Sequence, residues 1–200
     1  MQSTTKPYAE SCDQNRAPIL AVIAPLYAGR QRLLEIGSGT GQHGVHFAAA
    51  LPELCWQCSD RADELPGMRQ WIGEAALPNL PEPIALDVLR DPWPTPGFDA
   101  AFSANTAHIM PVEAVAAMFR GLGEVLAPGG LFALYGPFHE DGRPTSESNA
   151  AFDAWLRARD PAMGVRDRTW LLGLAEDNGF EALAEHAMPA NNRILVWRRG

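Results

Sequence analysis

The segment best suited to chemistry is the glycine-rich stretch at residues 33–42, which reads LLEIGSGTGQ. A hydrophobic run that contains an acid, Glu35, leads into three alternating glycines, Gly37, Gly39 and Gly41. In an α/β sheet, ligands meet the backbone at the carboxyl end of the first strand. Glycines there leave out Cβ atoms, so the chain can turn sharply and its N–H groups can touch a ligand. The stretch therefore predicts a ligand-binding loop.

Two further carboxylates stand at the ends of the next two predicted strands. Asp60 lies 19 residues beyond Gly41, where a carboxylate could accept both hydroxyls of a ribose. Asp87 ends the following strand, where it could accept from the exocyclic amine of an adenine. A glycine-rich turn alone can be only a tight connection, but an ordered set of acids and glycines at successive strand ends is far more specific. The set predicts a site for a nucleoside-containing ligand.

The register of the glycines separates two such ligands. A dinucleotide site needs the pattern G-x-G-x-x-G directly after the strand. Counted from Gly37, the sixth position of that pattern is Gln42 and not a glycine. A glycine triplet with the right spacing starts at Gly39, which is two residues too late. Glu35 would also repel a pyrophosphate and suits an amine or a cation. S-adenosylmethionine carries an α-amine and a sulfonium and no phosphate, so it is favoured. A nicotinamide-dependent oxidoreductase remains the weaker alternative.

The E-x-G-x-G-x-G loop, with acids at the next two strand ends, resembles the class I S-adenosylmethionine-dependent methyltransferases. Across nearly the whole chain the sequence is also similar to the methyltransferase-like protein 26 family, in residues 6–8 (KPY), 11–16 (SCDQNR), 34–43 (LEIGSGTGQH), 59–60 (SD), 135–138 (YGPF), 148–149 (SN) and 166–167 (RD). The resemblance implies a Rossmann-like α/β fold: a seven-stranded, mainly parallel sheet with helices on both faces and the last strand antiparallel. It implies S-adenosylmethionine as cofactor and S-adenosylhomocysteine as product, and it assigns no substrate.

The residues expected to hold that cofactor are Arg16, Glu35, Gly37, Ser38, Gly39, Gly41, Gln42, His43, Asp60, Arg61, Asp87, Val88, Ser103, Ala104 and Asn105.

Apolar periodicity predicts the elements that position these residues. The expected strands are 32–36, 54–59, 84–88, 98–104, 131–135, 180–188 and 193–198, and the expected helices are 19–27, 42–51, 68–76, 112–126, 152–159 and 169–178. Strands that alternate with helices imply βαβ units and a parallel sheet covered on both faces. The last two strands, separated only by residues 189–192, suit an antiparallel hairpin at the sheet edge. We expect a single domain over residues 1–200, with a substrate-side insertion at 137–168.

The polar segment 103–109, SANTAHI, follows the fourth strand, where the catalytic cleft opens in this architecture. Asn105 and His108 are its candidate catalytic residues, and His108 is the best-placed general base. The same segment could instead only cap the following helix. No Pro-Pro-aromatic set follows Asn105, which disfavours methylation of nucleic-acid bases. The substrate-side candidates are Tyr8, His108, Tyr135 and His139.

Residues 1–16 precede the βαβ repeat and carry a polar run that a core does not need. We expect this segment to act as a lid, in which Arg16 pairs with the methionyl carboxylate and Tyr8 shields the site from water. The alternative is a frayed terminus, followed by Asn15 as the N-cap of a helix with Pro18 in its first turn.

The amino-acid composition limits the classes of partner that the protein is expected to bind. Acidic residues outnumber basic ones 24 to 16, the net charge is −8, and the only lysine is Lys6. Without a cluster of bases, binding to nucleic acid or to an anionic membrane is disfavoured. The amino-terminal segment is polar and the apolar stretches are strand-length, which predicts no signal peptide and no membrane span.

The cysteines favour neither disulfides nor a metal. An odd number, three, does not make a disulfide framework, and Cys55 and Cys58 stand three apart in one predicted strand, on opposite faces. The sequence thus predicts a cytoplasmic, metal-free methyltransferase that acts on a small molecule or an exposed side chain. A binding protein that retains the fold without turnover is the alternative from another class.

Overall fold

A computed structural model of the chain describes residues 6–200. The helices are α1 (Glu10–Leu26), α2 (Gln42–Ala50), α3 (Leu65–Ala75), α4 (Val112–Val125), α5 (Glu147–Arg159), α6 (Arg168–Asp177) and the short 3₁₀ helix η1 (Pro189–Asn191). The strands are β1 (Arg32–Ile36), β2 (Cys55–Asp60), β3 (Ile84–Ala85), β4 (Phe98–Ala104), β5 (Leu126–Gly136), β6 (Phe138–Glu140), β7 (Arg143–Pro144), β8 (Arg166–Asp167), β9 (Phe180–Met188) and β10 (Asn192–Arg199).

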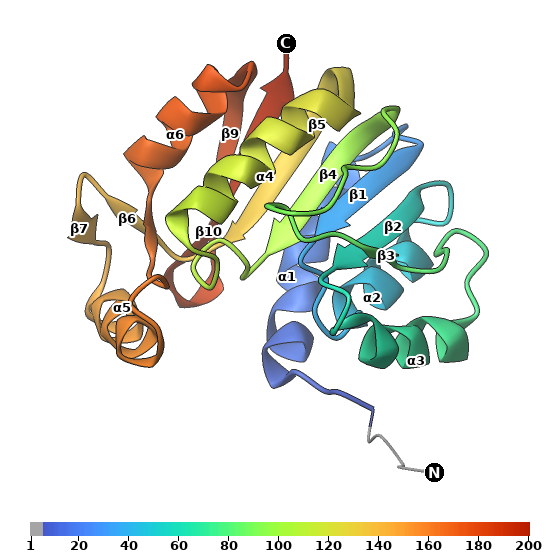
Figure 1. Ribbon diagram of the computed structural model, residues 1–200, viewed down its shortest axis with the longest axis horizontal. Coiled ribbons are helices and arrows are strands. Elements are labelled where there is room, and N and C mark those ends of the chain that lie inside the picture. Colours follow the sequence, from blue (N-terminus) through green and yellow to red (C-terminus); the bar gives the residue numbers. More distant parts are fainter. Residues whose placement is uncertain (1–5) are drawn as a thin grey trace.

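The main sheet has seven strands in the order β3-β2-β1-β4-β5-β10-β9 (Figure 1). Strand β10 pairs antiparallel with both β5 and β9, whereas the pairs from β3 to β5 are all parallel. This confirms the expected seven-stranded sheet with an antiparallel last strand and the terminal hairpin at its edge. The chain moves outward from β1 to β3 and then returns to β4, so the order reverses between β1 and β4. Ligands bind at such a reversal in open α/β sheets.

Helices cover both faces of the sheet (Figure 1), and each face has its own cluster of buried apolar side chains. On the face covered by α1, α2 and α3, the aromatic rings of Phe47, Trp56 and Phe102 pack with centroids 5.3 to 5.7 Å apart. On the face covered by α4 and α6, Phe119 packs edge-on against Trp197 at 5.2 Å. Strands buried on both faces explain the continuous apolar runs that the sequence shows.

Helix α1 begins earlier than expected, and the predicted start with Asn15 as N-cap and Pro18 in the first turn is wrong. The helix starts at Glu10 and holds both Pro18 and Pro25 inside it. Two features favour the earlier start of α1. The backbone N–H of Ala9, just before the helix, donates to Gln42 Oε1 at 2.7 Å, and acidic side chains in the first turn stabilise the positive end of the helix.

The third strand is shorter than expected. It covers only Ile84–Ala85, because the chain turns at Asp87, whose backbone N–H donates to Asp91 Oδ2 at 2.8 Å. Helix α5 in turn is longer than expected, because Ser146 caps its start by accepting from the Asn149 N–H. Strand β5 extends back to Leu126 through an irregular register opposite β4.

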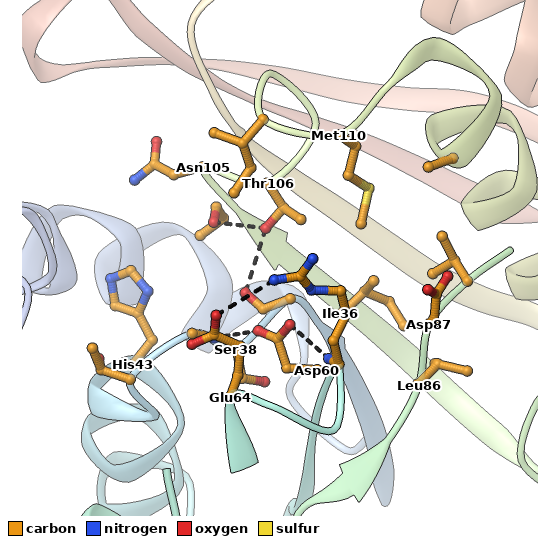
Figure 2. Close-up of a pocket in the computed structure, with 18 of the residues that line it drawn as sticks. Ile36, Ser38, His43, Asp60, Glu64, Leu86, Asp87, Asn105, Thr106 and Met110 are labelled. Atoms are coloured by element: carbon orange, nitrogen blue, oxygen red, sulfur yellow. Dashed lines mark hydrogen bonds and ion pairs between the residues drawn. The ribbon is translucent and has the colours of Figure 1, made fainter. Parts of the chain in front are cut away.

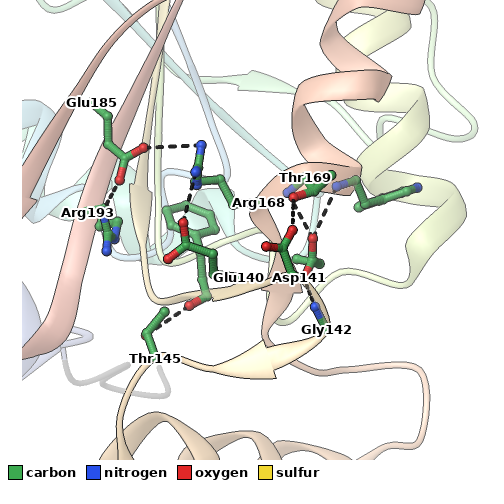
Figure 3. A network of polar contacts seen from close by, with 11 residues as sticks. Glu140, Asp141, Gly142, Thr145, Arg168, Thr169, Glu185 and Arg193 are labelled. Atoms are coloured by element: carbon green, nitrogen blue, oxygen red, sulfur yellow. Dashed lines mark hydrogen bonds and ion pairs between the residues drawn. The ribbon is translucent and has the colours of Figure 1, made fainter.

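The region 137–168 forms a small subdomain beside the carboxyl ends of the main strands (Figure 1). Strands β7, β6 and β8 make a three-stranded sheet, and α5 lies between β7 and β8 in sequence. Arg168 joins this sheet to the main one, since it pairs with Glu140 at 2.9 Å and with Glu185 of β9 at 3.6 Å (Figure 3). Arg193 of β10 pairs with the same Glu185. Within residues 6–200, no helix has the length and hydrophobicity needed to cross a membrane.

Candidate functional site

A cavity of about 600 Å³, here called the first cavity, opens at the carboxyl ends of β1, β2 and β4. Its wall comes from residues 36–40, 43, 60, 61, 64, 86–89, 104–106, 109–111, 114 and 163, with 9, 11 and 12 from the start of the chain. In Figure 2, Asn105 and Thr106 lie across the cavity from Ser38 and Asp60, and Asp87 lies at its far end. The cavity therefore occupies the chain reversal between β1 and β4, as the sheet topology predicts.

The three positions of the loop require glycine for different physical reasons. All three adopt positive φ, at 70° for Gly37, 55° for Gly39 and 85° for Gly41. A Cβ on Gly37 would lie 2.5 Å from Thr106 Cγ2, and one on Gly41 would lie 2.8 Å from Met68 Cγ. A Cβ on Gly39 would meet nothing within 4 Å. The outer two glycines thus permit close packing, whereas a side chain on Gly39 would meet only the open space of the first cavity.

Asp60 holds the loop from the end of β2. Its Oδ2 accepts the Gly39 N–H at 2.7 Å, and its Oδ1 accepts the Arg61 N–H at 2.8 Å. Burial raises the pKa of Asp60, and these two hydrogen bonds oppose the rise. Because a carboxylate has about four lone-pair sites, Asp60 keeps acceptor capacity toward the cavity.

Glu35 does not line the first cavity, contrary to its expected contact with a cofactor amine. It is buried between β1 and β2, where its Oε2 accepts from Trp56 Nε1 at 2.8 Å and from Cys58 Sγ at 3.4 Å. Burial raises the pKa of Glu35, although these hydrogen bonds act in the opposite direction. Its surroundings assign it to the packing of the sheet.

The raised pKa of Glu35 predicts a pH-dependent stability. The folded state holds the proton more tightly than the unfolded state, so stability falls as pH rises from the ordinary value of 4.5 through the raised pKa. The Glu35→Gln variant retains an acceptor for Trp56, and we expect a shallower fall of its thermal midpoint over that range. Glu35→Ala should instead lose about 2 to 4 kcal/mol, because it leaves the indole N–H unpaired and a void.

The matched control for this prediction is Glu124→Gln, which makes the same change on the exposed side of α4. Thermal unfolding of parent and variants from pH 4 to 8 measures the difference. Parallel profiles for the parent and Glu35→Gln would contradict a raised pKa for Glu35.

Four other residues expected to bind the cofactor lie away from the first cavity. Arg16 pairs with Asp13 at 2.6 Å and does not reach the wall. Ser103 is buried and donates to the Ile36 carbonyl at 2.9 Å, which joins β4 to β1. Gln42 Oε1 accepts a hydrogen bond from the Ala9 N–H, and Gly41 packs on α3. These residues position the loop and α1.

Of the residues expected to form a lid, Tyr8 and Arg16 do not line the first cavity. Residues 1–5 lie outside the described chain, and residues 10–16 form the first turns of α1. Tyr8 is 60% exposed and its hydroxyl donates to Asp13 at 2.5 Å, so it does not shield the cavity. The segment borders the first cavity through Ala9, Ser11 and Cys12 instead.

His108, the expected general base, lines neither this cavity nor the one described below. It is buried, its ring packs edge-on against Phe152 of α5 at 5.1 Å, and its carbonyl accepts the Gly164 N–H at 2.9 Å. Burial and the nearby Arg166 lower its pKa to about 4. His139 lies on β6, away from both cavities.

The structure does bring the remaining predicted residues together around the first cavity: Gly37, Ser38, Gly39, His43, Asp60, Arg61, Asp87, Val88, Ala104 and Asn105. Among the wall residues that sequence reasoning missed are Ile36, Thr40, Glu64, Leu86, Leu89, Thr106 and Met110. Each of these stands within a few positions of a predicted strand end, and that proximity was the available signal. Ala9, Ser11 and Cys12 also line the cavity, and they belong to the segment 1–16 that was expected to cover it.

A second cavity of about 540 Å³ adjoins the first, and Ser11 and Asn105 line both. Its wall comes from α1, the ends of β4 and β5, α5 and the 189–192 turn, and it includes Tyr135. Asn105 stands at the junction with φ of 57°, a left-handed conformation that asparagine adopts more readily than most residues. Of the substrate-side candidates, only Tyr135 lies on this wall.

Three solved structures show the fold that carries these cavities. The S-adenosylmethionine-dependent methyltransferase SibL matches with a TM-score of 0.80 at 23% identity, over 94% of this chain and 55% of that one. The mitomycin 7-O-methyltransferase MmcR matches with 0.83 at 18% identity, over 95% and 54%. Human N-acetylserotonin methyltransferase, solved with S-adenosylmethionine, matches with 0.79 at 16% identity, over 96% and 53%.

The chain spans about half the length of each of these proteins. At such identities the likeness establishes the architecture alone, a Rossmann-like methyltransferase fold. The sequence profile of one family covers residues 6–199, almost all of the described chain. The chain therefore belongs to the family described as protein of unknown function DUF938.

Proposed function

We propose that this protein binds S-adenosylmethionine in the first cavity and transfers its methyl group to a small-molecule or exposed side-chain acceptor. The observation that carries the proposal is the placement of Gly39, Asp60 and Asp87 on one cavity at the chain reversal of a methyltransferase-like sheet. The resemblance to the methyltransferase-like protein 26 family belongs to the same proposal. The solved neighbours that use this cofactor support it through their shared architecture.

The charges of the first cavity suit this cofactor. Its wall carries three carboxylates, Asp60, Glu64 and Asp87, against one cation, Arg61. Burial and nearby cationic groups lower the pKa of His43, also on the wall, to about 4, so its ring is neutral at pH 7. Such a wall attracts an amine or a sulfonium and repels a pyrophosphate. Asp60 is placed to accept the ribose hydroxyls, and Asp87 to accept from the adenine amine.

When bound, S-adenosylmethionine supplies an electrophilic methyl group: an acceptor lone pair bonds to that carbon, the carbon–sulfur electron pair goes to sulfur, and a proton leaves the methylated acceptor. The contribution of the chain is alignment and exclusion of water. Asp60 and Asp87 bind and do not react. Because His108 lies behind Phe152 and outside both cavities, we assign it no role as a base.

Parallel titrations with S-adenosylhomocysteine and NADH test the proposal. Calorimetry should show one molecule of S-adenosylhomocysteine bound per chain, and no heat from NADH at the same concentrations. Binding of NADH alone would favour the oxidoreductase, and binding of neither would overturn the proposal.

Turnover is tested separately from binding. The protein incubated with S-adenosylmethionine and cell extract should release S-adenosylhomocysteine, detected by mass spectrometry, above a control with heat-inactivated protein. Binding without release would instead identify a protein that holds the cofactor without transfer.

A further inference from the structure

We infer that the second cavity holds the methyl acceptor, that the acceptor is an uncharged molecule with hydrogen-bonding groups, and that the Tyr135 hydroxyl donates to it. The inference rests on the proposed function, since it assigns the acceptor side of the same site. The second cavity meets the first at Ser11 and Asn105, so a molecule held there lies next to the cofactor cavity.

The wall of the second cavity contains uncharged side chains. Among residues 6–200, no Asp, Glu, Lys, Arg or His lines it. Its polar groups are carboxamides and hydroxyls, including Gln14, Asn15, Asn192 and Tyr135, and its apolar surface comes from Phe152 and three prolines. The first cavity, in contrast, is walled by carboxylates. The two halves of the site therefore differ in the charge they accept.

An uncharged wall favours uncharged ligands, because a ligand must give up its water to enter the second cavity. A carboxylate, phosphate or ammonium that enters the second cavity loses water and gains no opposite charge, which is unfavourable. A carbonyl, amide or hydroxyl of the ligand can exchange its water for the carboxamides of the wall at little cost. The volume, about 540 Å³, falls within the usual range for small-molecule sites, about 300 to 1,000 Å³.

A chain of polar side chains leads from the wall of the first cavity, at Cys12 and His43, to Asn15 and Tyr135 on the wall of the second. His43 Nδ1 lies 4.0 Å from Cys12 Sγ, and His43 Nε2 lies 2.7 Å from Asn15 Oδ1. Burial raises the pKa of Cys12 to about 11, so at neutral pH the thiol carries its proton and can donate to Nδ1. The neutral His43 ring then has its proton on Nε2 and donates to Asn15 Oδ1.

This assignment leaves the Asn15 amide group as the donor to Tyr135. The hydrogen bond from Asn15 lowers the pKa of Tyr135 against the effect of burial, as a donor to the phenol oxygen does. Asn15 and Tyr135 line the same wall, and with the Asn15 oxygen occupied by His43 the Tyr135 O–H is left to donate to a molecule in the second cavity. Tyr135 is a positioning residue for the oxygen of an uncharged acceptor.

The walls come from segments that are firmly placed. Asn149 at the start of α5 donates to the Asn191 carbonyl at 3.2 Å, which joins α5 to the 189–192 turn across the cavity. The small sheet before and after α5 is fixed to β9 by Arg168 and Glu185 (Figure 3). The second cavity is therefore largely preformed, as small-molecule sites usually are.

Three probes of equal size test the inference: benzamide, benzoate and benzylamine, titrated by ligand-detected NMR into protein saturated with S-adenosylhomocysteine at pH 7.4. Benzamide should bind at least about tenfold more tightly than benzoate or benzylamine, because neither ion finds an opposite charge on the wall of the second cavity. Equal or tighter binding of an ion, or no binding of any probe, would overturn the inference.

Two variants locate the binding. Tyr135→Phe should weaken benzamide by about two- to tenfold, the range for one neutral hydrogen bond. The matched control Tyr8→Phe removes a phenol hydroxyl outside both cavities and should change nothing. Gln14→Glu should shift the preference toward benzylamine, whereas Gln31→Glu, the same charge change before β1, should not. Unchanged probe preferences in Tyr135→Phe and Gln14→Glu would contradict the inference.

The affinity for S-adenosylhomocysteine, measured for every variant, separates the two proposals. Neither Tyr135→Phe nor Gln14→Glu touches the first cavity, so both should keep the affinity of the parent. If the parent fails to bind S-adenosylhomocysteine, the proposed function fails. If it binds but the probes show no preference for benzamide, the inference alone fails.

Discussion

The Asp60→Ala variant is expected to bind S-adenosylhomocysteine at least about 100-fold more weakly than the parent. Two hydrogen bonds from ribose hydroxyls to a carboxylate are together worth about 3 kcal/mol or more. The variant also leaves the Gly39 and Arg61 N–H groups without their acceptor, so the loop at the cavity loses its support. Calorimetry with the purified variant measures the effect.

Asp63→Ala is the matched control for this experiment. Asp63 stands three residues further on, its side chain is 70% exposed, and it lies outside the first cavity. Its removal should leave the affinity unchanged. Asp60→Asn retains one acceptor oxygen and should give an intermediate loss. An Asp60→Ala variant that binds as tightly as the parent would remove Asp60 from the site.

The largest loss of stability is expected for Gly37→Ala, at about 3 kcal/mol or more. The positive φ of 70° is costly for any residue with a Cβ, about 1 to 2 kcal/mol. In addition, the new Cβ would lie 2.5 Å from Thr106 Cγ2 and 2.7 Å from Thr106 Oγ1. Overpacking of this kind adds about 1 to 3 kcal/mol. Urea unfolding measures the sum.

Gly39→Ala is the control that separates the two causes. Gly39 has a similar φ of 55°, but its Cβ would meet nothing within 4 Å, so only the backbone cost should remain. A second comparison places Gly37→Ala in a Thr106→Ala background, which removes the two clashing atoms. The double variant should recover part of the loss in a mutant cycle. Equal losses for Gly37→Ala and Gly39→Ala would show that the contact with Thr106 does not matter.

The fold and half of the site followed from local patterns in the sequence. Apolar runs that alternate with helical segments predicted the strands, and the glycines, Asp60 and Asp87 were recognised because each stands at a strand end. The carboxyl ends of parallel strands meet at one edge of a sheet, so residues at those ends come together whatever else the fold does. That rule needs no knowledge of side-chain packing, and the structure places Gly39, Asp60 and Asp87 on the wall of one cavity.

Tertiary contacts alone decided the orientation of the other candidates. Glu35 stands at the right strand end, but its carboxylate is bound by Trp56 and Cys58 of the neighbouring strand, more than 20 residues away. His108 follows the right strand, but Phe152 of the inserted helix covers it. In each case the partner comes from a distant segment, and local sequence does not show which side of a strand end that partner occupies.

The second cavity is the clearest case of a feature that sequence spacing cannot show. Its wall joins Ser11 near one end of the chain to Asn192 near the other, with Tyr135 and Phe152 between them. The amino-terminal segment was predicted as a lid, yet it enters the site as the first turns of α1, because Gln42 accepts the Ala9 N–H. The sequence by itself determined where the glycine-rich loop, Asp60 and Asp87 lie, since their positions depend on strand ends. Only the tertiary structure decided what faces that loop, because those contacts join segments that lie tens of residues apart in the sequence.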